Sequence, residues 1–434
     1  MYELLVLTLL FLMITLVILG KPERHLVGLI IILTLLFSKA LSIEETITYI
    51  NWDVLGLILG MSIFSVFLEI SGIAELVARI LIYKIQNPFL LFFTLIFSSG
   101  IISIVLENVT VVLLFAPIVF QIGKLTRIDV TGLMIGVALA SNMAGSATMI
   151  GDPPAIITAG HFNLSFMDFI IYRGKPSMFF ITLIPMILSC LTYTYIEHRK
   201  IEERKILLGE IVFSREKLFF GIDKLFIYET LLFLAIKITL LSIRDIIHVP
   251  LTIAALIGVG GLAITRIVIH KDLRSVRKAV KQGFEWKLLV FLAGVFTLSG
   301  AFAKYGLAEK FAETLLSYTS NNIFLITTIL IWFSVAVSAV MDNTPYVVTM
   351  LPVIDRLAVH LDIDPVTLAW ALLLGATLGG GITYIGASAN LVAVRLLEKQ
   401  GNKITFTHFI KKSLPFNLVN IFSGWLLFII FWLT

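Results

Sequence analysis

Four short stretches of this 434-residue chain place oxygen-bearing side chains inside otherwise apolar sequence. They cover positions 106–110, 141–154, 341–345 and 379–390. Carboxylate, amide and hydroxyl oxygens are the ligands that hard cations prefer, so these stretches suit a small cation or a proton. The candidate binding residues are Glu107, Asn108, Thr110, Asn142, Ser146, Thr148, Asp152, Asp342, Asn343, Thr344, Thr383, Ser388 and Asn390.

Three of these residues, Glu107, Asp152 and Asp342, are acids in apolar surroundings. In a bilayer, an ionised carboxylate costs on the order of 2.5 to 3.5 kcal/mol by insertion scales, so the three need water, a cation or bound protons. Acids that share a site titrate together, which would couple the binding of an ion to protonation. The structural interpretation stays open as well. Buried Asn and Thr often hydrogen-bond between helices, and Asp152 before two prolines is typical of a helix N-cap.

The elements that position these residues must be membrane helices. The chain is 59% hydrophobic and 14% charged, with a mean hydropathy of +1.01, which excludes a soluble domain. The net charge of +5 therefore predicts membrane topology rather than nucleic-acid binding. Cys190 is the only cysteine, which excludes an intramolecular disulfide and a cysteine-rich metal cluster. Apolar stretches of membrane-spanning character cover 4–20, 26–38, 54–70, 176–196, 225–242, 251–265, 288–302 and 415–433.

The polar stretches are also rich in Gly and Pro, which unwind helices. Free backbone groups at membrane depth are tolerated only where they line a cavity or are buried in protein. Two unwound helices in corresponding places are the sequence pattern typical of a transporter binding site.

An internal repeat relates the stretches in pairs. A shift of 234 to 235 residues aligns Gly, Pro, Asn and acidic positions in order, which indicates a duplication rather than shared hydrophobicity. The shift places Trp52 on Trp286, Gly60 on Gly294, Glu107-Asn108 on Asp342-Asn343, Pro117 on Pro352, Gly145 on Gly380, Thr148 on Thr383 and Gly151 on Gly386.

Each half is predicted to contain three spans, a pair of short helices with a polar tip, a broken span and a last span. The pairs cover 88–121 and 323–357, and each arm is short for a crossing, so both pairs are predicted to be re-entrant. Five crossings per half then invert the second half. The predicted fold is an all-α polytopic membrane protein of two inverted-topology repeats, each with a re-entrant helical hairpin and a broken transmembrane helix.

The predicted domains are residues 1–196 for the first repeat, 197–225 for a cytoplasmic linker and 226–434 for the second repeat. Most of the 33 Lys and Arg residues, including Arg24, Lys287 and Arg395, fall on the side of the linker. The positive-inside rule therefore predicts a multi-pass protein of the plasma membrane with both termini outside.

At these motifs the chain resembles the arsenite permease and sodium/proton antiporter (ArsB/NhaD) branch of the ion transporter superfamily, and it is similar to the P protein family. The residues that carry the resemblance are Glu107 to Thr110 with Pro117, Gly145 to Pro154, Asp342 to Pro345 with Pro352, and Gly386 to Asn390. The resemblance implies a scaffold, a mobile transport domain and a homodimer, and for an arsenite-type member a cytoplasmic ATPase partner. Two departures, Ala155 in place of Asn and Glu107 in place of Asp, leave the ion stoichiometry open.

The predicted function is a proton-coupled secondary transporter that exports a small inorganic solute, Na⁺ or arsenite/antimonite, by alternating access. Its partners are then the lipid bilayer and the solute, with no cofactor beyond the transported ion and protons. No Lys or Arg lies in the four polar stretches to pair with an anion, which argues against a bare oxyanion or a dicarboxylate. The alternatives are a sodium-coupled anion transporter of the citrate or dicarboxylate type and an ion channel. An intramembrane protease using Asp152 and Asp342 lacks a supporting motif, so no enzyme is predicted.

Overall fold

The computed structural model describes residues 2–19, 22–73, 76–77, 80, 87–126, 129–202 and 223–434, and these residues are almost all helical. Strands β1 (Ile171–Tyr172) and β2 (Lys175–Pro176) pair as a short antiparallel ribbon after the short 3-10 helix η1 (Met167–Phe169). Most of the predicted linker, residues 203–222, lies outside the described part of the chain.

The order of helices in the first half returns in the second half, as the repeat predicts. The first half contains α1 (Tyr2–Leu19), α2 (Arg24–Phe37), α3 (Ile43–Tyr49), α4 (Trp52–Ser71), α6 (Pro88–Ser103), α7 (Asn108–Thr126), α8 (Thr131–Gly145), α9 (Pro153–His161) and α10 (Met178–Glu202). The second half contains α11 (Lys224–Ser242), α12 (Arg244–Ile247), α13 (Leu251–Ile264), the π-helical turn η4 (Thr265–Ile269), α14 (Leu273–Gly283), α15 (Trp286–Lys304), α16 (Leu307–Thr319), α17 (Ile323–Ser338), α18 (Asn343–Leu361), α19 (Pro365–Gly379), α20 (Ser388–Lys399), α21 (Phe406–Phe428) and the π-helical turn η5 (Ile429–Leu433).

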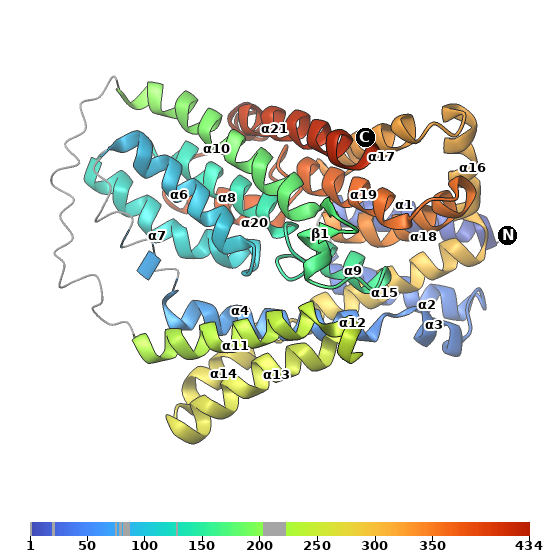
Figure 1. The fold of residues 1–434 in the computed structure, drawn as a ribbon, viewed down its shortest axis with the longest axis horizontal. Helices are drawn as coiled ribbons and strands as arrows, with labels where there is room; N and C mark the ends of the chain where they lie inside the picture. Colours follow the sequence, from blue (N-terminus) through green and yellow to red (C-terminus); the bar gives the residue numbers. More distant parts are fainter. Residues whose placement is uncertain are drawn as a thin grey trace.

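The pairs α6/α7 and α17/α18 are the two predicted hairpins. Helices α6 and α17 have 16 residues each, about 24 Å at 1.5 Å per residue, against a hydrocarbon core of ~30 Å. Figure 1 shows α6 and α7 toward one end of the molecule and α17 and α18 toward the other. This arrangement is that of two inverted repeats whose hairpins enter from opposite sides.

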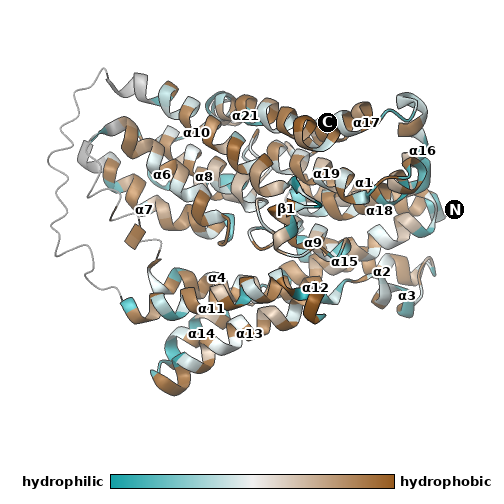
Figure 2. Cartoon of the chain, in the orientation of Figure 1, coloured by the Kyte–Doolittle hydropathy of each residue, from teal (hydrophilic) through white to brown (hydrophobic). Residues whose placement is uncertain are grey.

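The spans are apolar on the outside as well as inside. Seven helices of the described chain are long and apolar enough to cross a membrane. Leu232, Leu256 and Leu426 are each more than half exposed, and hydrophobic segments dominate the helices in Figure 2. The protein is therefore a polytopic all-α membrane protein, as predicted.

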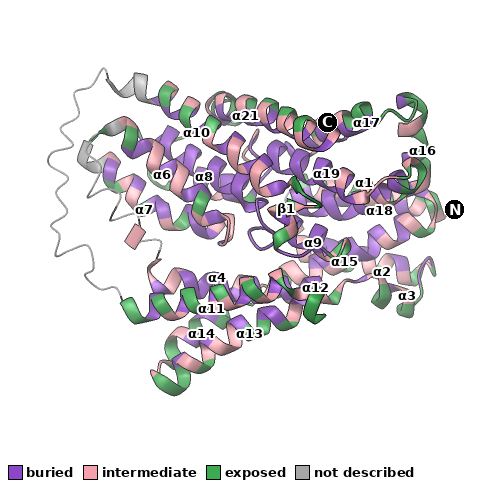
Figure 3. Cartoon of the chain, in the orientation of Figure 1, coloured by how far each residue is buried: buried purple, intermediate pink, exposed green. Residues whose placement is uncertain are grey.

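The helices form two groups, and Figure 1 shows α4, α11, α13 and α14 of the first group below α6, α8, α10 and α21 of the second. The scaffold group contains α1–α4 and α11–α15, the hairpin group contains α6–α10 and α17–α21, and α16 contacts both groups through α15 and α18. In the hairpin group, α6 and α7 pack on α8, α17 and α18 pack on α19, and α10 packs on α21. Helices α8 and α19 lie inside this group and are buried along nearly their whole length (Figure 3).

In the scaffold group, helices of one repeat pack on helices of the other: α2 packs on α15, and α13 packs on α4. Two aligned glycines lie at these crossings. A Cβ added at Gly294 would lie 2.4 Å from Gly28 Cα, and one added at Gly60 would lie 2.5 Å from Ala255 Cβ. The absence of a side chain lets the two backbones approach closely, as is common where membrane helices cross.

We expect Gly294→Ala to destabilise the protein, because the added Cβ would meet backbone of α2 that cannot move aside alone. Overpacking of this kind costs about 1–3 kcal/mol, so the midpoint of thermal unfolding in detergent should fall. Gly260→Ala is the matched control, since nothing lies within 4 Å of a Cβ added there. Equal midpoints for the two variants would contradict the close crossing.

Candidate functional site

Each broken span is tied to its hairpin by the same hydrogen bond in both repeats. The Thr148 hydroxyl donates to the Ile104 carbonyl at 2.7 Å, and the Thr383 hydroxyl donates to the Ala339 carbonyl at 2.5 Å. Both carbonyls lie at the C-terminal end of the first hairpin helix, where no helical partner remains for them. The two threonines thus satisfy backbone groups that lipid cannot.

The hairpin tips use one asparagine each in a second repeated contact. The Ser103 hydroxyl donates to Asn108 Oδ1 at 2.7 Å, and the Ser338 hydroxyl donates to Asn343 Oδ1. Asn390 supports the second break directly, because its Nδ2 donates to the carbonyl of Gly380 at 3.0 Å.

Glycines at the breaks make room for these amides. A Cβ added at Gly145 would lie 2.6 Å from Asn108 Oδ1, and one added at Gly380 would lie 3.0 Å from Asn343 Oδ1. The aligned glycines were predicted to unwind the helices, and the structure gives them this further role.

The two broken spans meet each other where Asn142 and Thr377 lie at corresponding positions of the two repeats. Asn142 Nδ2 donates to the Thr377 carbonyl at 3.2 Å, and the Thr377 hydroxyl donates to the Ser146 hydroxyl at 2.7 Å. Ser146 in turn donates to Asp152 Oδ2 at 2.7 Å. A continuous polar chain therefore joins the second repeat to the acid of the first.

The helices that follow the two breaks, α9 and α20, differ at their N-terminal ends. Asp152 caps α9, since its Oδ1 accepts from the backbone N–H of Ala155 at 3.1 Å. The corresponding residue in the second repeat is Ala387, which cannot cap α20 with a side chain. Ser388, the first residue of α20, is exposed to a cavity.

A small cavity of about 30 Å³ brings three acids together: Glu107 from a hairpin tip, Asp152 from a broken span and Glu285 from the scaffold group. Glu285 comes just before α15 and accepts a long hydrogen bond from the Ser62 hydroxyl at 3.5 Å. This volume holds on the order of one or two water molecules. The cavity suits a proton carrier or a small cation rather than an organic solute.

A large cavity of about 820 Å³ lies next to the small one and shares Glu107 and Glu285 with it. The second hairpin tip contributes Asp342, so the cavity brings both tips together as the repeat predicts. Basic residues line it too. Arg24 Nη1 lies 2.6 Å from Asp342 Oδ2, while the Lys287 ammonium pairs with Glu23 at the rim, and Arg395 also contributes to the lining.

Of the predicted binding residues, Glu107, Asp152, Asp342 and Ser388 line one of these two cavities. The others line neither of these two cavities, and most of them hold hairpins and breaks together. They are Asn108, Thr110, Asn142, Ser146, Thr148, Asn343, Thr344, Thr383 and Asn390.

Sequence reasoning missed Glu285 and Arg24. Glu285 precedes Trp286, and the repeat aligns it with Asn51, whose side chain caps α4 through the N–H of Val54. Glu285 makes no such cap, and this difference between the repeats was a usable signal. Arg24 was assigned to topology alone. The four polar stretches contain no basic residue, but the fold brings one to them.

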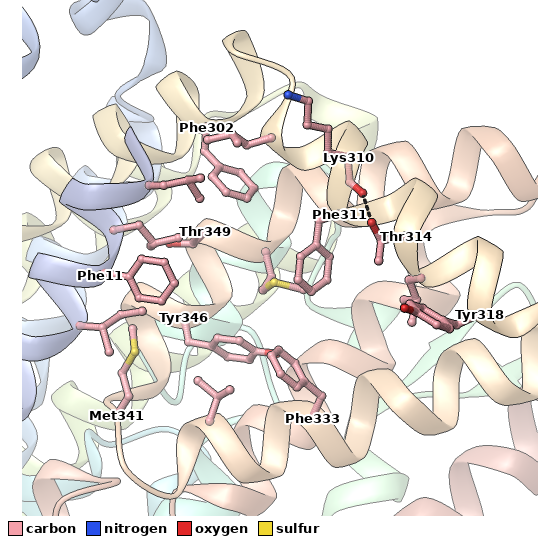
Figure 4. Close-up of a pocket in the computed structure, with 17 residues that line it drawn as sticks. Phe11, Phe302, Lys310, Phe311, Thr314, Tyr318, Phe333, Met341, Tyr346 and Thr349 are labelled. Carbon is pink, nitrogen blue, oxygen red and sulfur yellow. Dashed lines mark hydrogen bonds between the residues drawn. The ribbon is translucent and has the colours of Figure 1, made fainter. Parts of the chain in front are cut away.

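Two other cavities differ in character. One of about 580 Å³ lies between α1, α15, α16 and the second hairpin, and Figure 4 shows Phe11, Phe302, Phe311 and Phe333 around it. This lining does not suit an ion. Another, of about 480 Å³, lies between the start of α4, α9, the end of α15 and α18, and it is lined by His161 and Asp355, whose Nε2 and Oδ2 lie 2.9 Å apart.

Comparison with known proteins agrees with the membrane fold. A family model described as citrate transporter matches residues 14–375. An uncharacterized transporter of Mycobacterium tuberculosis is 31% identical over 382 residues, which are 86% of this chain and 85% of that protein. The human P protein is 25% identical over 460 residues, which are 88% of this chain but 54% of that protein.

A solved structure shares the fold. The crystal structure of the YdaH transporter of Alcanivorax borkumensis, described as having an unusual topology, is similar with a TM-score of 0.58. The match covers 98% of this chain and 97% of that chain at 16% sequence identity, so it concerns the fold alone.

We expect Thr383→Val to destabilise the protein by about 1–3 kcal/mol, because the buried carbonyl of Ala339 loses its donor. Thr383→Ser, which keeps the hydroxyl, is the matched control. Thermal unfolding in detergent measures the difference. If the valine and serine variants unfolded at the same temperature, the hydroxyl would not hold the break to the hairpin.

Proposed function

Since the chain belongs to the citrate transporter family of membrane transporters, we propose that it is a proton-coupled secondary transporter working by alternating access. The large cavity holds the solute, and the acids of the small cavity hold the coupling protons. The solute class that we favour is a small inorganic one, Na⁺ or arsenite/antimonite, moved outward across the plasma membrane.

The observation that carries the proposal is the pairing of Glu107 with Glu285. Both line the small cavity, and neither forms an ion pair with any described residue. Two ionised carboxylates in such a place would each cost several kcal/mol, so protons or a cation must neutralise them. Because both acids also line the large cavity, the charge they carry acts directly on a solute there.

The balance of charge favours a cation or a neutral hydroxylated solute. The Arg24 guanidinium is paired with Asp342 and the Lys287 ammonium with Glu23. Among the described residues, the remaining charges of the large cavity are two acids, Glu107 and Glu285, against the single cation Arg395, which leaves a net negative charge. Cys190 is fully buried, so a metalloid would bind through oxygen ligands. Asn390 Oδ1 is buried without a hydrogen-bond partner among the described residues, and it offers one such ligand at the second break.

The proposal includes a homodimer with both termini outside, and a cytoplasmic ATPase partner if the solute is of the arsenite type. The homodimer and the ATPase follow from the resemblance to the arsenite permease and sodium/proton antiporter branch, and the orientation of the termini follows from the distribution of Lys and Arg.

A second candidate is a cation-coupled carboxylate transporter. In the first repeat, the Asp152 carboxylate caps the start of α9; in the second, the start of α20 faces the large cavity with no side-chain cap. A solute carboxylate could occupy the place that Asp152 occupies in the other repeat, where helix N–H groups favour an anion. Arg395 lines the same cavity, and the family description points the same way.

Reconstitution into liposomes with an imposed pH gradient tests the function. We expect saturable, proton-driven flux of one solute among Na⁺, Li⁺, arsenite, silicic acid and citrate, with counterflow of the labelled solute. Citrate flux that requires a cation would favour the second candidate. Flux without saturation or counterflow would indicate a channel and contradict the proposal.

We expect Glu107→Gln and Glu285→Gln each to abolish proton-driven flux, because either change leaves the small cavity one titratable acid short. Glu45→Gln is the control, since Glu45 pairs with Lys304 and lines neither cavity. Size-exclusion chromatography establishes that each variant folds. Proton-driven flux retained by both cavity variants would remove these acids from the coupling mechanism.

A further inference from the structure

The ion pair between Arg24 and Asp342 connects the two groups of helices. Arg24 begins α2 in the scaffold group, and Asp342 caps α18 at the tip of the second hairpin, where its Oδ1 accepts from the N–H of Thr344 at 3.2 Å. Its Oδ2 accepts from Arg24 Nη1 at 2.6 Å. The carboxylate thus uses one oxygen to hold its own helix and the other to hold the scaffold group.

The two hairpin tips meet opposite charges on the scaffold group, although their acids correspond in the repeat. Glu107 shares its cavity with the carboxylate of Glu285, whereas Asp342 meets the guanidinium of Arg24. A proton or cation is needed at the first tip and is excluded from the second while Arg24 is present. The repeat is symmetric in backbone and asymmetric in charge.

We propose that Arg24 is an internal counter-ion that holds the second hairpin tip to the scaffold group while the site is empty, and leaves when a cation or proton reaches Asp342. This positioning role rests on the proposed function. A guanidinium stays charged at every physiological pH, so Arg24 can leave only by moving. Its side chain is 42% exposed, against 15% for Asp342, so it can swing toward water while the carboxylate stays.

The pair gives coupling a physical basis. Alternating access requires the hairpin group to move against the scaffold group, and this movement breaks the Arg24–Asp342 contact. In the empty protein, the break would leave Asp342 without a counter-ion at membrane depth, which is costly. A bound cation or proton removes that cost, so the loaded form moves and the empty form is held.

A second ion pair in the same cavity is a matched control. Glu23 precedes α2 and Lys287 lies on α15, so this pair connects two parts of the scaffold group and does not reach a hairpin. Both side chains are more than half exposed. Lys287→Gln removes a positive charge from the cavity rim and leaves the hairpin contact in place.

The test measures the position of the hairpin tip without any solute. Spin labels at Val340→Cys on the tip and Val268→Cys on the scaffold group, in a Cys190→Ser background, report the distance between the groups by pulsed electron paramagnetic resonance. Both positions are exposed, at 45% and 68%. We expect one dominant distance in the parent protein, and Arg24→Gln should raise the minor population about two- to fivefold, as for a partly exposed ion pair.

Three further variants make the result specific. Asp342→Asn, which keeps an oxygen to cap α18, should give the same distribution as Arg24→Gln, and the exchange of Arg24→Asp with Asp342→Arg should restore part of the parent distribution, because it restores the ion pair but not the cap of α18. The minor population of Arg24→Lys should lie between those of the parent protein and Arg24→Gln. Arg24→Lys replaces Arg24→Gln in the test if the glutamine variant does not fold. An unchanged distribution in Arg24→Gln, or the same change in Lys287→Gln, would overturn the proposal.

The transport measurements separate this inference from the function on which it rests. If the distance changes appear as expected but no solute shows proton-driven flux, the hairpin contact stands and the proposed function fails. If proton-driven flux is present and the distances do not respond to Arg24, the function stands and the counter-ion role is wrong.

Discussion

The structure depends on one constraint: backbone groups freed by a broken helix must find partners inside the protein, because lipid offers none. Thr148 and Thr383 meet this need at the hairpin carbonyls, and Asn390 meets it at the second break. The same contacts fix the hairpin tips against the breaks. The acids at the tips and at the first break are held in place by these backbone contacts.

The repeat, the hairpins and the breaks could be predicted from the sequence because each has a local cause. Gly and Pro interrupt helices wherever they occur in the chain, and a duplication keeps them at a constant distance. The roles of single side chains were harder to predict. Asn108 and Thr148 have the chemistry of ligands, yet their oxygens hydrogen-bond to the C-terminal end of hairpin helix α6. Arg24 and Asp342 are far apart in the chain, and no local pattern relates them.

The combination of acids and bases around one cavity limits the kinds of solute that it can take. A site with acids alone would hold cations so tightly that release would be slow, and a site with bases alone would exclude them. Here the Asp342 carboxylate is neutralised by Arg24, while Glu107 and Glu285 need a bound proton or cation. Both proposed solute classes, the cation and the carboxylate, need acids that change their charge during the cycle.

Because α2 packs on α15 and α4 packs on α13, each of these helices depends on a partner from the other repeat. Helix α4 is synthesised long before α13, the helix that covers it, and α2 likewise waits for α15. During translation, the glycine faces of α2 and α4 therefore stay without their protein partners until α15 and α13 have been made.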